Sequence, residues 1–406
     1  MRILVALTYY RPHYSGLTLY TERVARLLAE RGHQVSILTS RFDPGLSKYE
    51  RCDGVEVYRP RVWFHISKGV IMPSMPFMAW KLIRKADVVH LHVPQFDAAS
   101  IAVLSRLMRK PVILTYHCDL RLPAGAVHHL ANRVSDAANH VTASAANVIV
   151  HNTLDYAQNS PFLRRYLHKL QPVFPPVEVE QVSQTDLRAF REKYHILPEQ
   201  RIIGMAARLA SEKGVEFLAQ ALPLVLKEFP QARVLFVGPH QNVVGEEKYA
   251  RRVAQLIAPL EGQWSFLGTA ASKEMSAFFH TSEVLVLPSI NSTESYGMVQ
   301  VEAMACGVPV VATDLPGVRV PVRETGAGLI VPPANAEELA RALIAILRDP
   351  ERYRGHTEDF VKLSTPESVA NQYEKIFDRA LRNTQPERLP QVAADEETDC
   401  DMMSKE

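Results

Sequence analysis

Short runs of Val, Ile and Leu alternate with helical segments along most of this chain, and this alternation restricts the fold more than any other feature. The first run, MRILVAL, is followed by the loop TYYRPHYSGLT, an amphipathic helix that ends at Gly32, and a second strand, QVSILTS. Strand, helix and strand at such short spacing predict a βαβ unit with a right-handed connection and a parallel sheet. The further runs ADVVHLHVP, PVILTYH and NVIVHN extend the series as strands buried on both faces.

A second series of βα units begins at RIIGMAARL and continues through ARVLFVGP, GQWSFLG, EVLVLPS, VPVVAT and GAGLIVPP. We therefore predict an α/β protein with two parallel-sheet domains, residues 1–175 and residues 200–365. The proline-rich stretch QPVFPPVEVEQ opens a connection between them over residues 176–199. We expect a helix over residues 366–383 that packs back on the N-terminal domain, and a disordered acidic tail over residues 384–406.

Composition and charge narrow the classes of protein that the chain can belong to. No run of 18 apolar residues exists, and the N-terminus lacks a basic region followed by a cleavage site, so we expect a cytoplasmic protein without a spanning helix. Residues 1–180 carry 22 Lys and Arg against 13 Asp and Glu, and the remainder 24 against 31, giving charges of +9 and −7. The basic half suits the inner face of an anionic membrane or a phosphorylated acceptor. No basic motif interleaved with aromatic residues indicates nucleic acid as a partner.

The cysteines and histidines give little support to a metal site. The four cysteines, Cys52, Cys118, Cys306 and Cys400, form no C-x-x-C pair, which argues against a disulfide framework and a thiolate zinc site. His90 and His92 share one face of a strand, but no third ligand accompanies them. We predict no bound metal and no cofactor.

Two carboxylates lie eight positions apart in ESYGMVQVEAMACG, Glu294 on a loop and Glu302 inside the following helix. The free backbone N–H groups between them, from Gly297 to Val299, point out of a helix N-terminus and attract phosphate. A sugar nucleotide needs both features, because its diphosphate requires donors and its hydroxyls require acceptors. The alternative is a surface helix with two solvated glutamates.

Two further stretches lie at the carboxyl ends of predicted strands. RLASEKG places Arg208 and Lys213 five positions apart after the first strand of the second series, where two cations suit a diphosphate. His117 follows a strand of the first series, at the edge where open α/β sheets bind ligands. A histidine that only caps the strand end is the alternative for His117.

Taken with GVPVVATDLPGV, these elements resemble the retaining glycosyltransferases of family 4, which have the GT-B fold of two Rossmann-like domains facing each other across a donor-binding cleft. The resemblance covers the chain up to about residue 383 and is strongest where R-x4-K, E-x7-E and PVVAT occur in order. It implies a hexosyltransferase that takes a nucleotide-diphosphate sugar as donor. The acceptor would be a glycan, a lipid-linked molecule or a small molecule, as in cell-envelope or glycolipid biosynthesis.

The resemblance also implies a role for each matching residue. Arg208 and Lys213 would neutralise the diphosphate, Glu294 would bind hydroxyls of the donor sugar, and Glu302 would accept from the ribose. The amides at Gly297, Met298 and Val299 would help to hold the phosphate or sugar, Gly268 would lie near the base, Gly16 near the donor, and His117 would approach the donor sugar from the N-terminal domain.

One departure from the family pattern occurs in the N-terminal loop, where many members have two adjacent glycines. Here the loop reads YSGLT, so that Gly16 keeps one glycine and Ser15 replaces the other. The departure bears on how closely this loop approaches the donor phosphate or acceptor, and it leaves the C-terminal site unchanged.

The charges predict how the bond between sugar and diphosphate breaks. Arg208, Lys213 and a helix N-terminus would stabilise the leaving group, and no D-x-D motif lies near the donor site, so we expect metal-independent transfer. Both glutamates are assigned to binding, which favours same-side displacement over a covalent intermediate. A GT-B epimerase, a sugar phosphorylase and a noncatalytic nucleotide-sugar-binding protein remain alternatives.

Overall fold

The structure is a computed structural model that describes residues 1–66, 69–119, 126–243 and 245–384. Its first sheet contains β1 (Arg2–Ala6), β2 (Gln34–Leu38), β3 (Tyr49–Cys52), β4 (Val55–Tyr58), β7 (Val88–Val93), β8 (Val112–Tyr116), β9 (Val148–His151) and β10 (Leu170–Pro172). Its second sheet contains β11 (Arg201–Ala206), β12 (Ala232–Val237), β13 (Trp264–Gly268), β14 (Val284–Leu287), β15 (Val310–Thr313) and β16 (Gly328–Val331). A separate hairpin pairs β5 (Phe64–Ile66) with β6 (Gly69–Ile71). Apart from Thr384, the predicted tail lies outside the described residues.

Helices connect the strands of both sheets. The first part of the chain contributes α1 (Gly16–Glu30), α2 (Met75–Lys85), α3 (Ala98–Leu107), α4 (Ala126–Ala145) and α5 (Leu154–Asn159). The second part contributes α6 (Gln184–Lys193), α7 (Val215–Leu226), α8 (Glu247–Ile257), α9 (Ser272–Thr281), α10 (Met298–Ala305), α11 (Val320–Thr325) and α12 (Ala336–Arg348). The chain then continues through α13 (Glu358–Leu363) into α14 (Pro366–Thr384).

Both sheets are doubly wound. The strand order is β10-β9-β8-β7-β1-β2-β4-β3 in the first sheet and β13-β12-β11-β14-β15-β16 in the second. The second sheet is entirely parallel, and in the first sheet β3 runs antiparallel to β4. The order reverses beside β1 in the first sheet and beside β11 in the second, and ligands of such sheets bind beyond the carboxyl ends of the strands at these switch points.

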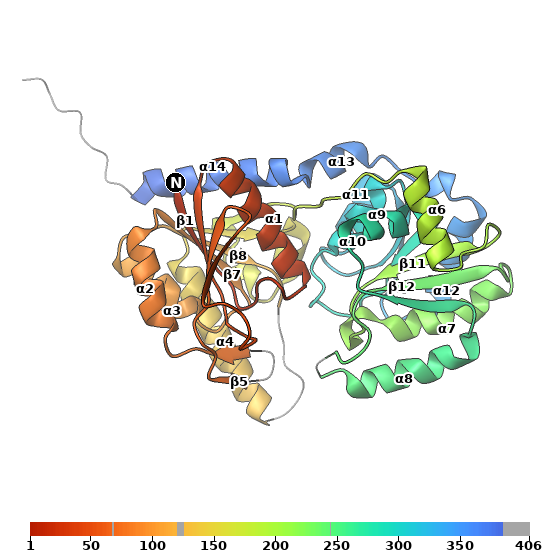
Figure 1. Ribbon diagram of the computed structural model, residues 1–406, viewed down its shortest axis with the longest axis horizontal. Helices are drawn as coiled ribbons and strands as arrows, with labels where there is room; N and C mark the ends of the chain where they lie inside the picture. Colours follow the sequence, from red (N-terminus) through yellow and green to blue (C-terminus); the bar gives the residue numbers. More distant parts are fainter. Residues whose placement is uncertain (67–68, 120–125, 244, 385–406) are drawn as a thin grey trace, which may run out of the picture.

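Apolar side chains cover both faces of the first sheet. Leu4, Leu91 and Leu114 face a core that also holds Ala79 of α2 and Ile101 of α3. On the opposite face, residues of β1 and α1 pack with α14, whose buried residues are Pro366, Val369, Ala370, Tyr373, Ile376, Phe377 and Ala380. The last helix of the described chain therefore lies against α1 on the first sheet, as Figure 1 shows.

The second sheet is likewise covered on both faces. One core joins α7, α8 and α12 through residues such as Leu222, Val253 and Leu343. The other core joins α9 and α10 through Phe278 and Ala303. The two sheets thus form separate three-layer units, and Figure 1 shows α1 of the first unit facing α10 of the second.

Two expectations about the chain as a whole can be compared with the described residues. Within them, no helix is both long enough and apolar enough to cross a bilayer. Cys52, Cys118 and Cys306 are unpaired thiols, whereas Cys400 lies outside the described residues.

Candidate active site

The loops that follow β11 and β14 meet at the switch point of the second sheet. Gly214, after β11, has φ +63°, and a Cβ atom there would lie 2.1 Å from the carbonyl oxygen of Pro288, which follows β14. Only glycine permits both the left-handed conformation and this contact. The close approach brings the loop of Arg208 and Lys213 beside the loop of Glu294.

Lys213 and Glu294 form an ion pair at this junction. The Lys213 Nζ atom donates to Glu294 Oε2 at 2.6 Å, and both side chains are largely shielded from solvent. Arg208 pairs with Glu212 on its own loop, and its guanidinium is more exposed than the Lys213 ammonium. The structure therefore brings Lys213 and Glu294 into contact, and it places Arg208 on the same loop as Lys213, paired with Glu212.

The N-terminus of α10 lies directly after Glu294. Gly297 caps the helix with φ +79°, where a Cβ atom would lie 2.2 Å from Leu287 Cδ2. Among the residues that the structure describes, the amides of Met298 and Val299 donate to no acceptor. These two N–H groups are the unpaired donors that the sequence predicts at this turn.

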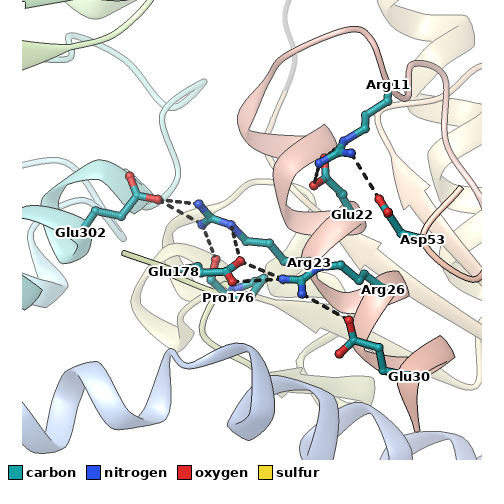
Figure 2. Close-up of polar contacts among 9 residues, drawn as sticks. All are labelled: Arg11, Glu22, Arg23, Arg26, Glu30, Asp53, Pro176, Glu178 and Glu302. Atoms are coloured by element: carbon teal, nitrogen blue, oxygen red, sulfur yellow. Dashed lines mark hydrogen bonds and ion pairs between the residues drawn. The ribbon is translucent and has the colours of Figure 1, made fainter. Parts of the chain in front are cut away.

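Glu302 is buried, not solvated. The residue is 8% exposed, and its Oε1 atom accepts from both Nη1 and Nη2 of Arg23 at 3.0 Å (Figure 2). Arg23 belongs to α1, so the contact joins the two sheet units. For Glu302 this rules out the simpler alternative of a glutamate on a solvated helix face.

Further contacts bring the first unit against the same loops. A Cβ atom on Gly16 would lie 3.6 Å from Met298 Cε, so the starts of α1 and α10 are adjacent. Tyr156 of α5 donates to the carbonyl oxygen of Ser292 at 2.9 Å and accepts from the amide of Asp119 at 2.7 Å. Tyr156 thus ties the loop after β8 to the loop that carries Glu294.

A second ion pair holds α5 to the second unit. Arg319 donates to both oxygens of Asp155, through Nη2 at 2.8 Å and Nε at 3.0 Å, and the amide of Gly317 adds a bond at 2.8 Å. Burial opposes ionisation of Asp155, but Arg319 and Gly317 outweigh it and keep the pKa of Asp155 below its usual value. A bidentate, partly buried pair of this kind fixes orientation as well as distance.

His117 follows β8 and joins a network of buried histidines. Its Nε2 atom lies 2.9 Å from His92 Nδ1, and its ring packs edge-on against Tyr20. Burial and the neighbouring His151 lower the pKa of His117 to about 3, so the ring is neutral at pH 7. A neutral imidazole can orient a hydroxyl group but carries no charge to a phosphate.

The residue after His117 is Cys118, a free thiol. Burial, together with the charges of Asp119 and Glu294, raises the pKa of the Cys118 thiol to about 12. The Cys118 thiol is therefore protonated at pH 7.

His90 and His92 are buried within the first unit. His90 Nε2 lies 2.7 Å from the hydroxyl of Thr115, and burial lowers the pKa of His90 to about 3. Within the described ranges, no group of three or more His, Cys, Asp and Glu side chains could hold a metal ion. The histidines instead fill the interior between the first sheet and α14, where His90 also packs against Tyr373.

Gly268 ends β13, two strands away from β11. Its φ is +75°, and a Cβ atom there would meet nothing within 4 Å. Its carbonyl oxygen accepts from the amide of Gly238 at 2.8 Å, and Gly238 packs against the backbone before Arg208. Gly268 therefore lies on the same sheet edge as Arg208, without a direct contact to the ion pairs.

Several residues of the junction were not predicted from the sequence, notably Arg23, Tyr156, Asp155 and Arg319. Each makes a contact across more than 100 positions of sequence, and no local pattern marks such a partner. Ser15 is different, because its hydroxyl accepts from the Thr18 amide at 3.2 Å and caps α1. A serine followed by a helical pattern is a recognisable N-cap, which gives the departure from two glycines a structural role.

Both halves of the chain match known protein families. Residues 15–183 match the family described as Glycosyl transferase 4-like domain, and residues 186–359 match Glycosyl transferases group 1. The chain is 23% identical over 402 residues to N-acetyl-alpha-D-glucosaminyl L-malate synthase of Bacillus anthracis, covering 94% of this chain and 98% of that protein. It is 27% identical over 407 residues to D-inositol 3-phosphate glycosyltransferase of Stackebrandtia nassauensis, covering 92% and 89%.

Solved structures share the arrangement of the whole chain. HepE of Anabaena, solved in complex with UDP and glucose, superposes with a TM-score of 0.74 at 19% identity and covers 93% of this chain and 100% of its own. Sucrose-phosphate synthase from Thermosynechococcus elongatus gives a TM-score of 0.73 at 20% identity, with coverage of 94% and 99%.

Proposed function

The chain belongs to glycosyltransferase family 4 and has the GT-B fold, and on that premise we propose that it transfers a hexose, with retention of configuration, from a nucleoside-diphosphate sugar to a hydroxyl acceptor. The observation that carries the proposal is the Lys213–Glu294 ion pair beside the open amides of α10. This arrangement offers cations and N–H donors to a diphosphate and a carboxylate to sugar hydroxyls. The complex of HepE with UDP and glucose supports a nucleotide sugar as the donor class.

In this proposal each end of the donor meets a different group. Arg208 and Lys213 neutralise the diphosphate, and the amides of Met298 and Val299 add hydrogen bonds to it. Glu294 accepts from the hydroxyls of the sugar. We propose that Glu302 accepts from the ribose, that Gly268 leaves room for the base, and that Gly16 allows α1 to approach the donor.

The proposed reaction depends on charge that develops on the leaving group. The bond between the anomeric carbon and the diphosphate oxygen breaks, and its electron pair moves onto the diphosphate beside Lys213 and Arg208. The acceptor hydroxyl forms its bond to the same face of the sugar, and its proton passes to the departing oxygen. Preorganised cations that bind this developing charge more tightly than the ground state lower the barrier without a metal ion. Neutral His117 orients the sugar in this scheme.

A panel of UDP-, GDP- and ADP-linked hexoses tests the proposal. We expect hydrolysis or transfer with one nucleotide class, continued activity in EDTA, and a product whose anomeric configuration, read by NMR, matches that of the donor. An inverted product would contradict retention. Tight binding of a nucleotide sugar with no turnover of any donor in any acceptor mixture would favour a noncatalytic binding protein.

We also propose that the first unit binds the surface of an anionic membrane, which would give access to a lipid-linked acceptor. Residues 59–86 contain six Lys and Arg and no Asp or Glu. Within this stretch, α2 buries Met75, Ala79, Leu82 and Ile83 and exposes Phe77 and Trp80. The Nζ atom of Lys81 lies 4.3 Å from the ring centroid of Phe77, and the Cζ atom of Arg84 lies 5.0 Å from the ring centroid of Trp80.

The neighbouring helix continues the same surface. α3 packs beside α2 at the edge of the first unit (Figure 1) and exposes Val103, Leu107 and Arg106. Aromatic rings with basic groups beside them suit the interface of a bilayer, where rings lie at the headgroups and each basic residue adds about 1 kcal/mol at an anionic surface.

Sedimentation with vesicles of phosphatidylglycerol and phosphatidylcholine tests this second proposal. We expect binding to the anionic vesicles that falls steeply with salt and is lost in Phe77→Ser/Trp80→Ser and in Lys81→Glu/Arg84→Glu. Arg341→Glu, an exposed charge reversal on α12 of the second unit, is the control and should bind as wild type. Absence of binding at low salt, or equal loss in the control, would contradict a membrane surface at α2.

A further inference from the structure

Arg23 lies at the centre of a chain of charged groups that links three segments. Its Nη1 and Nη2 atoms donate to Glu302 Oε1, and Nη1 also donates to the carbonyl oxygen of Pro176 at 2.9 Å. Its Nε atom lies 3.9 Å from Glu178 Oε2. Figure 2 shows the guanidinium placed between α10 and the connection between the two units.

The guanidinium is held on more than one side. Glu178 also accepts from Arg26 Nη2, at 2.9 and 3.1 Å, and Arg26 lies one turn further along α1 than Arg23. The side chains of Arg23 and Glu302 are only 13% and 10% exposed. A planar guanidinium fixed by a carbonyl oxygen and two carboxylates has little freedom to turn away from Glu302.

The contact uses only one side of the Glu302 carboxylate. Both Nη atoms of Arg23 donate to Oε1 of Glu302. Across the described parts of the chain, Oε2 of Glu302 accepts no hydrogen bond. An ionised carboxylate can accept on both oxygens, so the second oxygen keeps its capacity for a ligand hydroxyl.

We propose that Arg23 is a positioning residue for the nucleotide, which acts by holding Oε1 of Glu302 so that Oε2 is presented to the ribose hydroxyls. The inference rests on the proposed role of Glu302 in the preceding section. Arg23 makes no contact with the donor itself. Because Arg23 belongs to the first unit and Glu302 to the second, the ribose is bound strongly only when the two units are together.

Two physical effects underlie this role. The guanidinium of Arg23 holds the Glu302 carboxylate in one orientation, and a carboxylate accepts stronger hydrogen bonds from hydroxyl groups than a neutral acceptor does. The fixed guanidinium also restricts the Glu302 side chain to few rotamers before the nucleotide binds. Less conformational entropy is therefore lost on binding than with an unrestrained side chain.

The test compares nucleotides with and without ribose hydroxyl groups. Calorimetric titration with UDP, GDP and ADP identifies the diphosphate that wild type binds, and the 2′,3′-dideoxy form of that nucleotide then measures the contribution of the hydroxyl groups. We expect wild type to prefer the ribose form by about ten- to a hundredfold. In Arg23→Gln this preference should fall to within about threefold.

Arg26→Gln is the matched control. The substitution removes a neighbouring guanidinium of α1, which donates to Glu30 and Glu178. It leaves the Arg23–Glu302 contact in place. We expect it to keep the full preference for ribose. If Arg23→Gln does not fold, as judged by circular dichroism and Tm, Arg23→Lys replaces it, because an ammonium retains the charge but not the two-nitrogen contact.

The outcomes separate this inference from the proposed function. Full preference for ribose in a folded Arg23 variant would overturn the positioning role. Tighter nucleotide binding by the variant than by wild type would also overturn it, because Arg23 would then compete with the nucleotide for Glu302. Glu302→Gln distinguishes the two failures. If Glu302→Gln also keeps the preference, the ribose role of Glu302 is wrong; if it loses the preference and Arg23 variants keep it, only the inference about Arg23 is wrong.

Discussion

Lys213 Nζ and Glu294 Oε2 lie 2.6 Å apart at the point where the loops after β11 and β14 touch. Each side chain therefore has a partner of opposite charge before any ligand arrives. The pair keeps a cation and a carboxylate in place where little solvent reaches them. In the proposed function, a diphosphate that binds here takes over part of the role of Glu294 as the partner of Lys213.

The first prediction is that Lys213→Ala lowers kcat by about a hundred- to a thousandfold. In the proposed reaction the ammonium binds a leaving group whose negative charge grows as the glycosidic bond breaks, and removal of one such preorganised donor costs about 2.7 to 4 kcal/mol. Steady-state kinetics at saturating donor measure the effect. Lys273→Ala is the control, because Lys273 pairs with Asp186 on the surface of the second unit. A kcat within about threefold of wild type in a folded Lys213 variant would show that the diphosphate assignment is wrong.

The second prediction is that Glu302→Gln weakens nucleotide binding by about 1.5 to 3 kcal/mol, because a neutral amide replaces a charged acceptor. Calorimetric titration with the nucleotide measures this loss. Gln at this position also leaves Arg23 without its ion pair, so the Tm should be measured on the same preparation. An unchanged affinity in a correctly folded variant would argue against any contact between Glu302 and the ribose.

Much of the architecture follows from the sequence because it is encoded locally. The runs at β1, β8, β14 and β15 are almost entirely apolar and largely buried, as parallel strands covered on both faces require. The strands β3 and β4 were not predicted, since YERC and VEVY are short and carry charges at the edge of the sheet. The helix α2 was also missed, because prolines at 73 and 76 interrupt the stretch in which it begins.

The residues of the candidate site likewise include some that the sequence predicts and some that it does not. Arg208, Lys213 and Glu294 could be grouped in advance, because carboxyl ends of neighbouring parallel strands share one edge of a sheet. The pairing of Arg23 with Glu302 joins positions 279 residues apart, and it depends on how two separately folded units meet. No periodicity within α1 distinguishes Arg23 from Arg26. Arg26 pairs instead with Glu30 of the same helix and with Glu178 of the connection between the two units.

The third prediction concerns the serine that replaces a glycine before α1. Ser15→Ala should destabilise the first unit by about 0.5 to 2 kcal/mol, because the amide of Thr18 loses its acceptor, whereas Ser15→Gly should cost only a few tenths. Hydrogen exchange at the start of α1 measures the difference. Equal protection in wild type and both variants would mean that the cap contributes nothing.

The fourth prediction is a loss of stability in mild acid that originates in the buried histidines. Burial, together with the charge that His117 would carry, lowers the pKa of His90 to about 3, whereas an unfolded histidine titrates near 6.5. The unfolded chain therefore binds a proton below pH 6.5 that the folded chain does not, so the stabilisation is fully present above pH 6.5 and is lost as the pH falls toward 3.

Between pH 6.5 and pH 5 this difference should lower the free energy of unfolding by about 1.7 kcal/mol for each such histidine. Urea unfolding followed by circular dichroism at several pH values measures the slope. His90→Gln keeps a polar group for Thr115 but cannot titrate, so its stability should depend less steeply on pH than that of wild type. His195→Gln, at an exposed position, is the control and should retain the wild-type slope. If His90→Gln also retains it, proton uptake by the unfolded state at this position does not limit stability, and the acid sensitivity must come from another group.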